Sequence, residues 1–149
     1  MTRTHQLTLS FLGAVSLAAT AALASGGLDS TNTRLTANLT GANEVPGPGD
    51  TDGKGKATFE LEAAHDKICY KLKVEGIDEA TMAHIHKGAT GVAGGVMVKL
   101  EPPAKGFSSN CTQIPPELTE GLMKTPGDYY VNVHNAAFPN GAIRGQVSK

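Results

Sequence analysis

Apolar and polar residues alternate with a period of two along most of this 149-residue chain. Leu35, Ala37 and Leu39, for example, are separated by Thr36 and Asn38. Because successive side chains of a β-strand point to opposite faces, this pattern predicts strands with one buried face. Short runs of this kind occupy residues 35–40, 57–61, 68–74, 81–86, 96–100, 129–134 and 143–147.

The segments between these runs contain much of the glycine and proline, which total 18 and 8 residues in the chain. They predict a long loop over residues 41–55, a glycine-rich loop over 87–95, irregular chain over 101–114 and a turn at Asn140-Gly141. A helical period occurs only after Pro115, where Leu118 and Leu122 share one face. The sequence therefore predicts an all-β domain, an antiparallel β-sandwich or flattened barrel with one short helix.

The N-terminal 24 residues have the features of a signal peptide. Arg3 precedes an apolar stretch over residues 7–23, and Ala22-Leu23-Ala24 has the small-x-small form of a cleavage site. Polar residues interrupt the apolar stretch, which disfavours the alternative of a retained membrane anchor. We expect residues 1–24 to be removed and residues 25–33 to form a flexible leader. The protein is then exported, either to a periplasm or out of the cell, with no membrane insertion after cleavage.

The remaining residues, 34–149, have the length of one domain. The chain carries 13 Lys and Arg against 14 Asp and Glu, and the basic residues are scattered rather than clustered. Aromatic residues make up only 5% of the chain. A nucleic-acid partner is therefore not expected.

Cys69 and Cys111 are the two cysteines of the chain. An oxidising compartment favours a disulfide between them. The alternative, a pair of metal-binding thiolates, is disfavoured because neither cysteine has a second one nearby in the sequence. The sequence therefore predicts a disulfide that joins two distant segments.

Three histidines lie in two of the predicted strands. His84 and His86 are two residues apart and share one face, whereas Ala83 and Ile85 point to the other face. His134 likewise lies opposite Val131 and Val133. The small or apolar residues can fill a core while the imidazoles face outward. Two such strands brought together predict a three-nitrogen site for a transition metal.

Three further residues are candidates to support this site. Met82 shares the face of the strand that carries His84, so it is either a soft ligand that favours Cu(I) or a packing residue. Asn132 shares the face of His134 and can hold a ring nitrogen in one tautomer. Arg144 either attracts anions toward the metal, or is an ordinary surface residue, or donates to a carbonyl that fixes the loop over residues 135–141. Asn43 and Glu44 fall in the predicted 41–55 loop. This loop either folds over the site or, as is usual for a carboxylate in a mobile loop, leaves Glu44 solvated.

Three blocks of sequence resemble the chordin-type (CHRD) domain of secreted bacterial proteins. They read LTANLTGANEV at residues 35–45, AHIHKGATG at 83–91 and YYVNVHNAAFPNGAIRGQV at 129–147. The resemblance covers almost all of the expected mature chain. It implies an extracellular domain.

A more distant likeness concerns copper,zinc superoxide dismutase, a Greek-key β-sandwich with its copper outside the barrel. The shared order is an H-x-H strand, a later V-x-H and a glycine-arginine turn before the last strand. This likeness implies the same Greek-key topology for this chain. It also implies that His84, His86 and His134 are copper ligands and that Arg144 guides superoxide. The chain has no histidine-rich loop after His86, so the likeness does not extend to the bridging histidine or the zinc ligands.

The leading hypothesis is an exported CHRD-domain protein that binds one copper ion through the three histidines. One alternative is a non-catalytic extracellular binding or matrix module, in which the histidines are polar surface groups. Its ring nitrogens are expected to lie more than roughly 5 Å apart, because metal–nitrogen bonds are about 2.0–2.1 Å long. A second alternative is a copper-only enzyme similar to superoxide dismutase. No catalytic side chain is expected from the sequence.

Overall fold

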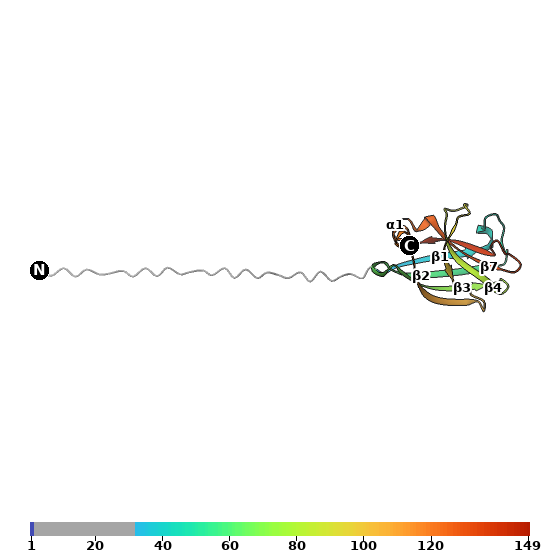
Figure 1. The fold of residues 1–149 in the computed structure, drawn as a ribbon, viewed down its shortest axis with the longest axis horizontal. Helices are drawn as coiled ribbons and strands as arrows, with labels where there is room; N and C mark the ends of the chain where they lie inside the picture. Colours follow the sequence, from blue (N-terminus) through green and yellow to red (C-terminus); the bar gives the residue numbers. More distant parts are fainter. Residues whose placement is uncertain (2–31) are drawn as a thin grey trace.

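The computed structural model describes Met1 and residues 32–149. Eight strands in this part of the chain form one antiparallel sheet that curls into a nearly closed barrel (Figure 1). The strands are β1 (Asn32–Thr40), β2 (Lys54–Glu62), β3 (Lys67–Glu75), β4 (Ala80–Lys87), β5 (Val96–Leu100), β6 (Phe107–Gln113), β7 (Tyr129–Asn135) and β8 (Ile143–Ser148). One α-helix, α1 (Pro116–Lys124), and three short 3-10 turns, η1 (Gly41–Asn43), η2 (Ala63–His65) and η3 (Pro126–Asp128), complete the fold.

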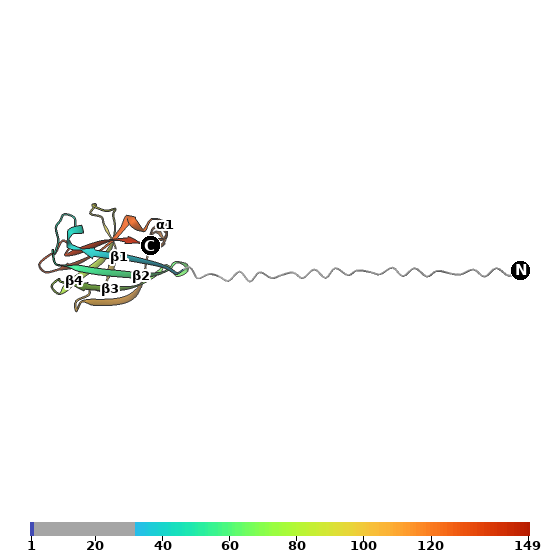
Figure 2. The ribbon, with the colours of Figure 1, turned by 180° about the vertical axis from the view of Figure 1, so that it is seen from behind.

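The order of the strands in the sheet is β5-β4-β7-β8-β1-β2-β3-β6. β3 therefore lies beside β6 and β4 beside β7, so the connections skip neighbours in the Greek-key manner. Seen from behind, β1, β2 and β3 run side by side along the barrel wall (Figure 2). The predicted all-β, antiparallel, Greek-key fold with one short helix is confirmed.

The edges of the sheet, β5 and β6, approach each other through side-chain hydrogen bonds rather than a strand ladder. The Tyr70 hydroxyl accepts from the backbone N–H of Glu101 at 2.7 Å, and the Ser108 hydroxyl donates to the Glu101 carbonyl oxygen at 2.7 Å. These contacts satisfy the backbone N–H and carbonyl oxygen of Glu101, where β5 and β6 do not pair as strands.

The core forms from the apolar positions of each alternating strand. In the register of β1, β2 and β3, Leu35 lies opposite Phe59, and Phe59 lies opposite Tyr70. All three face the barrel interior and are almost completely buried. Burial of a large apolar side chain stabilises the fold by roughly 1.5–3 kcal/mol. Leu118 and Leu122 of α1 join the same core, as their shared helical face predicts.

The structure corrects the prediction of irregular chain over residues 101–114. Residues Phe107–Gln113 form strand β6, which pairs with β3 along its whole length. The sequence FSSNCTQ has no apolar alternation because β6 is an exposed edge strand, with Ser108 its only buried residue. Tertiary pairing, rather than its own pattern, makes this segment a strand.

The expected signal peptide and leader lie mostly outside the described residues. The predicted signal peptide, residues 1–24, lies outside them apart from Met1. Strand β1 begins at Asn32, so it includes the last two residues of the expected leader, Asn32 and Thr33. None of the helices in residues 32–149 has the length and apolar character needed to cross a membrane.

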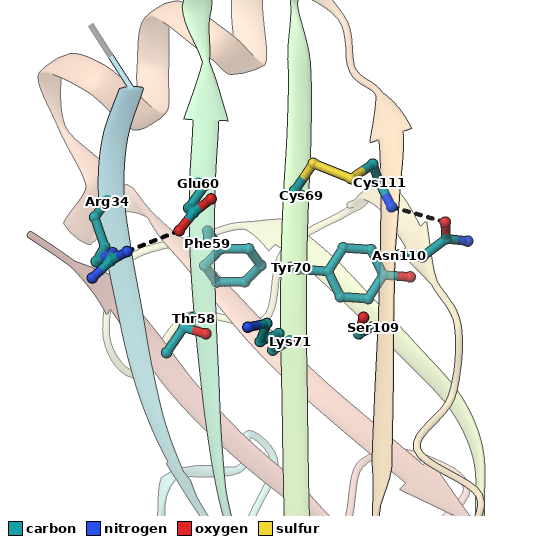
Figure 3. A pocket seen from close by; sticks show the side chains of 10 residues that line it. All are labelled: Arg34, Thr58, Phe59, Glu60, Cys69, Tyr70, Lys71, Ser109, Asn110 and Cys111. Atoms are coloured by element: carbon teal, nitrogen blue, oxygen red, sulfur yellow. Dashed lines mark hydrogen bonds and ion pairs between the residues drawn. A yellow bond between two sulfur atoms is a disulfide. The ribbon is translucent and has the colours of Figure 1, made fainter.

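The predicted disulfide between Cys69 and Cys111 is confirmed. The two cysteines lie directly opposite each other in the β3–β6 register. The bridge lies on the outer face of these strands, next to a hollow of about 550 Å³ where Arg34 of β1 also pairs with Glu60 of β2 at 2.8 Å (Figure 3). It fixes the exposed edge strand to the barrel covalently.

Replacing both cysteines by alanine should lower the free energy of unfolding by about 4 kcal/mol in the loop-entropy view, since the bridge closes a separation of 42 residues. Urea denaturation of the oxidised protein and of the double variant measures this difference. Dithiothreitol should destabilise the natural chain and leave the variant unchanged. An unchanged urea midpoint for the natural chain after verified reduction would contradict the prediction.

Candidate metal centre

Strands β4 and β7 bring the three predicted histidines together. Met82 lies opposite His134 in the register, and His84 lies opposite Asn132. His86 lies opposite Tyr130 in the same ladder. All of these side chains belong to the outward face of the two strands, because their neighbours Ala83, Ile85, Val131 and Val133 fill the core.

One ring nitrogen from each of the three histidines lies within 4.8 Å of those from the other two. His84 Nδ1 and His134 Nε2 are 3.2 Å apart. Two nitrogens bound to one tetrahedral ion, with bonds of about 2.0–2.1 Å, are separated by about 3.3 Å. The His84–His134 pair has about that spacing, and a nitrogen of His86 lies within 4.8 Å of both partners. The cluster could therefore hold a metal ion.

Loop carbonyls orient two of the rings. His86 Nδ1 donates to the Gly94 carbonyl oxygen at 2.9 Å, and His134 Nδ1 donates to the Pro139 carbonyl oxygen at 3.0 Å. These donors place a proton on each Nδ1, which leaves the Nε2 lone pair of His134 for a ligand bond, whereas His86 Nε2 faces Asn132 Oδ1. The orientation is typical of metal-binding histidines, whose second nitrogen is held by a backbone carbonyl.

Asn132 lies between the imidazoles of β4. Its Oδ1 is 2.9 Å from His86 Nε2. The predicted proximity of Asn132 to a ring nitrogen is therefore present, and the ring is that of His86. Since Asn132 contacts the nitrogen that faces the cluster, His86 must release this amide in order to bind an ion.

The outward-facing imidazoles are less exposed than the sequence predicts. His84 is 9% exposed, and His86 and His134 are each 7% exposed. The loops after β4 and β7 carry Gly94 and Pro139 over the outer face, so the rings are covered without entering the core. The histidine cluster is therefore partly desolvated, and it lies between the outer face of the barrel and the covering loops.

Burial lowers the pKa of His84 below its ordinary value of 6.5, and the neighbouring His134 and His86 lower it further. Burial also lowers the pKa of His134, against a smaller opposing effect of its bond to Pro139. Both rings are therefore neutral at pH 7. The neutral form is the one that binds metals.

Arg144 occupies a different position from those expected. It is only 2% exposed, so it is not a surface residue. Its Nη2 donates to the carbonyl oxygens of Ala89 and Val92 at 3.0 and 2.9 Å. It thereby fixes the loop after β4 rather than the loop over residues 135–141.

A stack of three side chains connects Arg144 with the histidine cluster. The rings of His86 and Tyr130 are parallel, with centroids 4.7 Å apart, and Arg144 Cζ lies 3.4 Å from the Tyr130 centroid. Groups at these distances cannot share one face of the ring, so Tyr130 separates the guanidinium from His86. Cation–π attraction stabilises this arrangement.

Met82 is 44% exposed at the outer end of the cluster. It is the register partner of His134, and its exposure argues against a role in core packing. Its thioether is therefore free to turn toward the cluster.

Glu44 is a buried residue that the sequence reading placed in solvent. It is 6% exposed, and its Oε1 has no hydrogen-bond partner. Burial raises its pKa to about 7, while the charge of Arg144 opposes the shift. Gly141, with φ 140°, packs against the carboxyl group where a Cβ would collide. The Asn140-Gly141 turn was the available signal, but a turn does not reveal what packs against it.

The fold and the cluster define a class of small, disulfide-bonded, antiparallel β-barrels with three histidines grouped on the outer face of two strands. The sequence matches the CHRD domain family over residues 35–147, which is nearly all of the described barrel. This chain belongs to the CHRD domain family. No curated protein and no solved structure matches it, so the likeness to superoxide dismutase remains a prediction.

The metal-free histidines should titrate at low pH. We expect the NMR Cε1–H signals of His84 and His134, assigned with His84→Gln and His134→Gln, to have midpoints below 6.5. Because a lowered pKa means that the unfolded chain binds protons first, these rings contribute stability above pH 6.5 that is lost as pH falls through their folded midpoints. Midpoints at or above 6.5 would show that the cluster is solvated.

Glu44 should give the opposite pH dependence. Its folded pKa of about 7 lies above the ordinary 4.5, so its contribution is present below pH 4.5 and is lost as pH rises through 7. Glu44→Gln mimics the protonated form and should be more stable than the natural chain at pH 8, with the difference shrinking toward pH 4.5. Urea denaturation between pH 4.5 and pH 8 measures this difference in the free energy of unfolding. Glu79→Gln is the control, because Glu79 is exposed. A constant difference would refute the assignment.

Proposed function

We propose that this chain is an exported CHRD-domain protein that binds one transition-metal ion, copper, through His84, His86 and His134. The observation that carries the proposal is the grouping of ring nitrogens from two strands within 4.8 Å. The hydrogen bonds from Nδ1 of His86 and His134 to loop carbonyls support it, because they leave Nε2 as the nitrogen through which each ring can bind an ion.

The choice of copper follows from the donor chemistry. No carboxylate belongs to the histidine cluster of the described residues, and neutral imidazoles suit copper, zinc and nickel better than calcium or magnesium. Among divalent ions, copper binds nitrogen sites most tightly. The exposed Met82 thioether is available as a soft fourth ligand, which favours Cu(I) in particular.

Proton positions change when the site is filled. Since His134 Nδ1 donates to Pro139, His134 Nε2 accepts from His84 Nδ1–H in the metal-free protein. Binding requires both of these nitrogens as lone-pair donors, so the His84 proton moves to Nε2. Asn132 must at the same time release His86 Nε2. Copper held by these three histidines would supply storage, delivery or slow redox chemistry.

Export to a periplasm or beyond the cell is part of the proposal. The features of residues 1–24 support it, and the disulfide between Cys69 and Cys111 fits an oxidising compartment.

Titration of the purified protein with Cu(II), and with Cu(I) under a competing chelator, tests the proposal. We expect saturation at one equivalent and a loss of at least 100-fold in affinity for the His84→Ala/His86→Ala double variant. His65→Ala is the matched control, because His65 is exposed on η2 and lies outside the cluster. Circular dichroism verifies that each variant is folded.

Equal copper uptake by the folded double variant would overturn the proposal. Absence of uptake by the natural chain would favour the alternative of an extracellular module without metal. A fivefold preference for zinc over copper under competition would leave the site but change the metal.

A further inference from the structure

Lys99 is the charged side chain that strand pairing places beside the cluster. It lies directly opposite His84 in the β4–β5 register. Val98 and Leu100 face the core, so Lys99 faces outward on the same side as His84. Within residues 32–149 it forms no ion pair, even with Glu101 two positions along the chain.

The cluster is covered unevenly. Gly94 and Pro139 cover the sides of His86 and His134, whereas His84 makes no hydrogen bond to a loop carbonyl in the described part of the chain. His84 is also the most exposed of the three rings. Among the described residues, His84 is therefore the ring of the cluster with no loop-carbonyl contact, and Lys99 of β5 is its neighbour in the sheet.

Arg144 is not placed to attract a small molecule to the histidine cluster. Its Nη2 is held by two carbonyl oxygens, and Tyr130 separates the guanidinium from His86. Lys99 is the cationic residue that the strand register places directly beside His84.

We propose that a small monovalent anion binds at the open position of the metal, between the ion and the Lys99 ammonium. This inference rests on the proposed metal site and names the class of its exogenous ligand. Three neutral imidazoles leave the full charge of the ion uncompensated, and a neighbouring ammonium adds to the attraction for an anion. Water is the ligand that the anion replaces. Lys99 is a positioning residue in this arrangement.

Azide is the probe, added to the Cu(II)-loaded natural chain and followed by its charge-transfer absorption and by electron paramagnetic resonance. We expect Lys99→Met to weaken azide binding about three- to tenfold, the effect of one partly screened charge. Copper affinity should not fall. Lys99→Arg should bind azide as the natural chain does. Lys56→Met, on β2, is the matched control for loss of an exposed lysine and should also leave azide affinity unchanged.

Salt supplies a second readout. The difference in azide affinity between the natural chain and Lys99→Met should shrink as sodium perchlorate rises from 0.02 to 0.5 M, in keeping with shorter screening lengths of roughly 20 to 4 Å. A structural effect of the substitution would not depend on salt in this way.

The outcomes separate the two proposals. If the natural chain binds no copper, the proposed function fails. If copper binds but azide affinity is the same for the natural chain and Lys99→Met, or if Lys56→Met weakens it equally, the metal site stands and the role of Lys99 is refuted. A salt-sensitive loss of azide affinity that is confined to Lys99→Met supports the role of Lys99.

Discussion

The two-residue period of β4 and β7 is the constraint on which the structure depends. Ile85 and Val131 are fully buried, and their burial fixes the register of the two strands. The same register sets His84 and His134 at ring-nitrogen contact on the opposite face. A slip of one residue would bury imidazoles and expose the core. The free energy that folds the barrel therefore also positions the candidate ligands.

Loops add the orientation that strands alone do not supply. The loop after β4 carries Gly94 to His86, and Arg144 of β8 holds that loop through the carbonyls of Ala89 and Val92. Tyr130 stacks between Arg144 and His86. A change at β8 can thus disturb a ring on β4 without touching it. Such support around a ligand is what makes a site preorganised rather than merely present.

The sequence predicts those features that leave a local pattern or follow from composition. Alternation identifies the face that carries His84 and His86, and the presence of two cysteines in a chain that is expected to be exported predicts the disulfide. It does not identify β6, because an exposed edge strand needs no apolar face. It also misplaces Glu44 and Arg144, whose burial comes from loops that fold over the barrel. Contacts between distant loops have no periodic signature, so they emerge only from the folded structure.

The charge around the cluster bears on the oxidation state that the proposed site would favour. The described ligand group contains imidazoles and no carboxylate, while Lys99 lies opposite His84. In a partly desolvated site, neutral donors and a nearby ammonium destabilise the higher charge of Cu(II) more than that of Cu(I). Bound anion reverses part of this bias by compensating the extra charge. The same lysine that attracts an anion would therefore also couple anion binding to the redox balance of the ion.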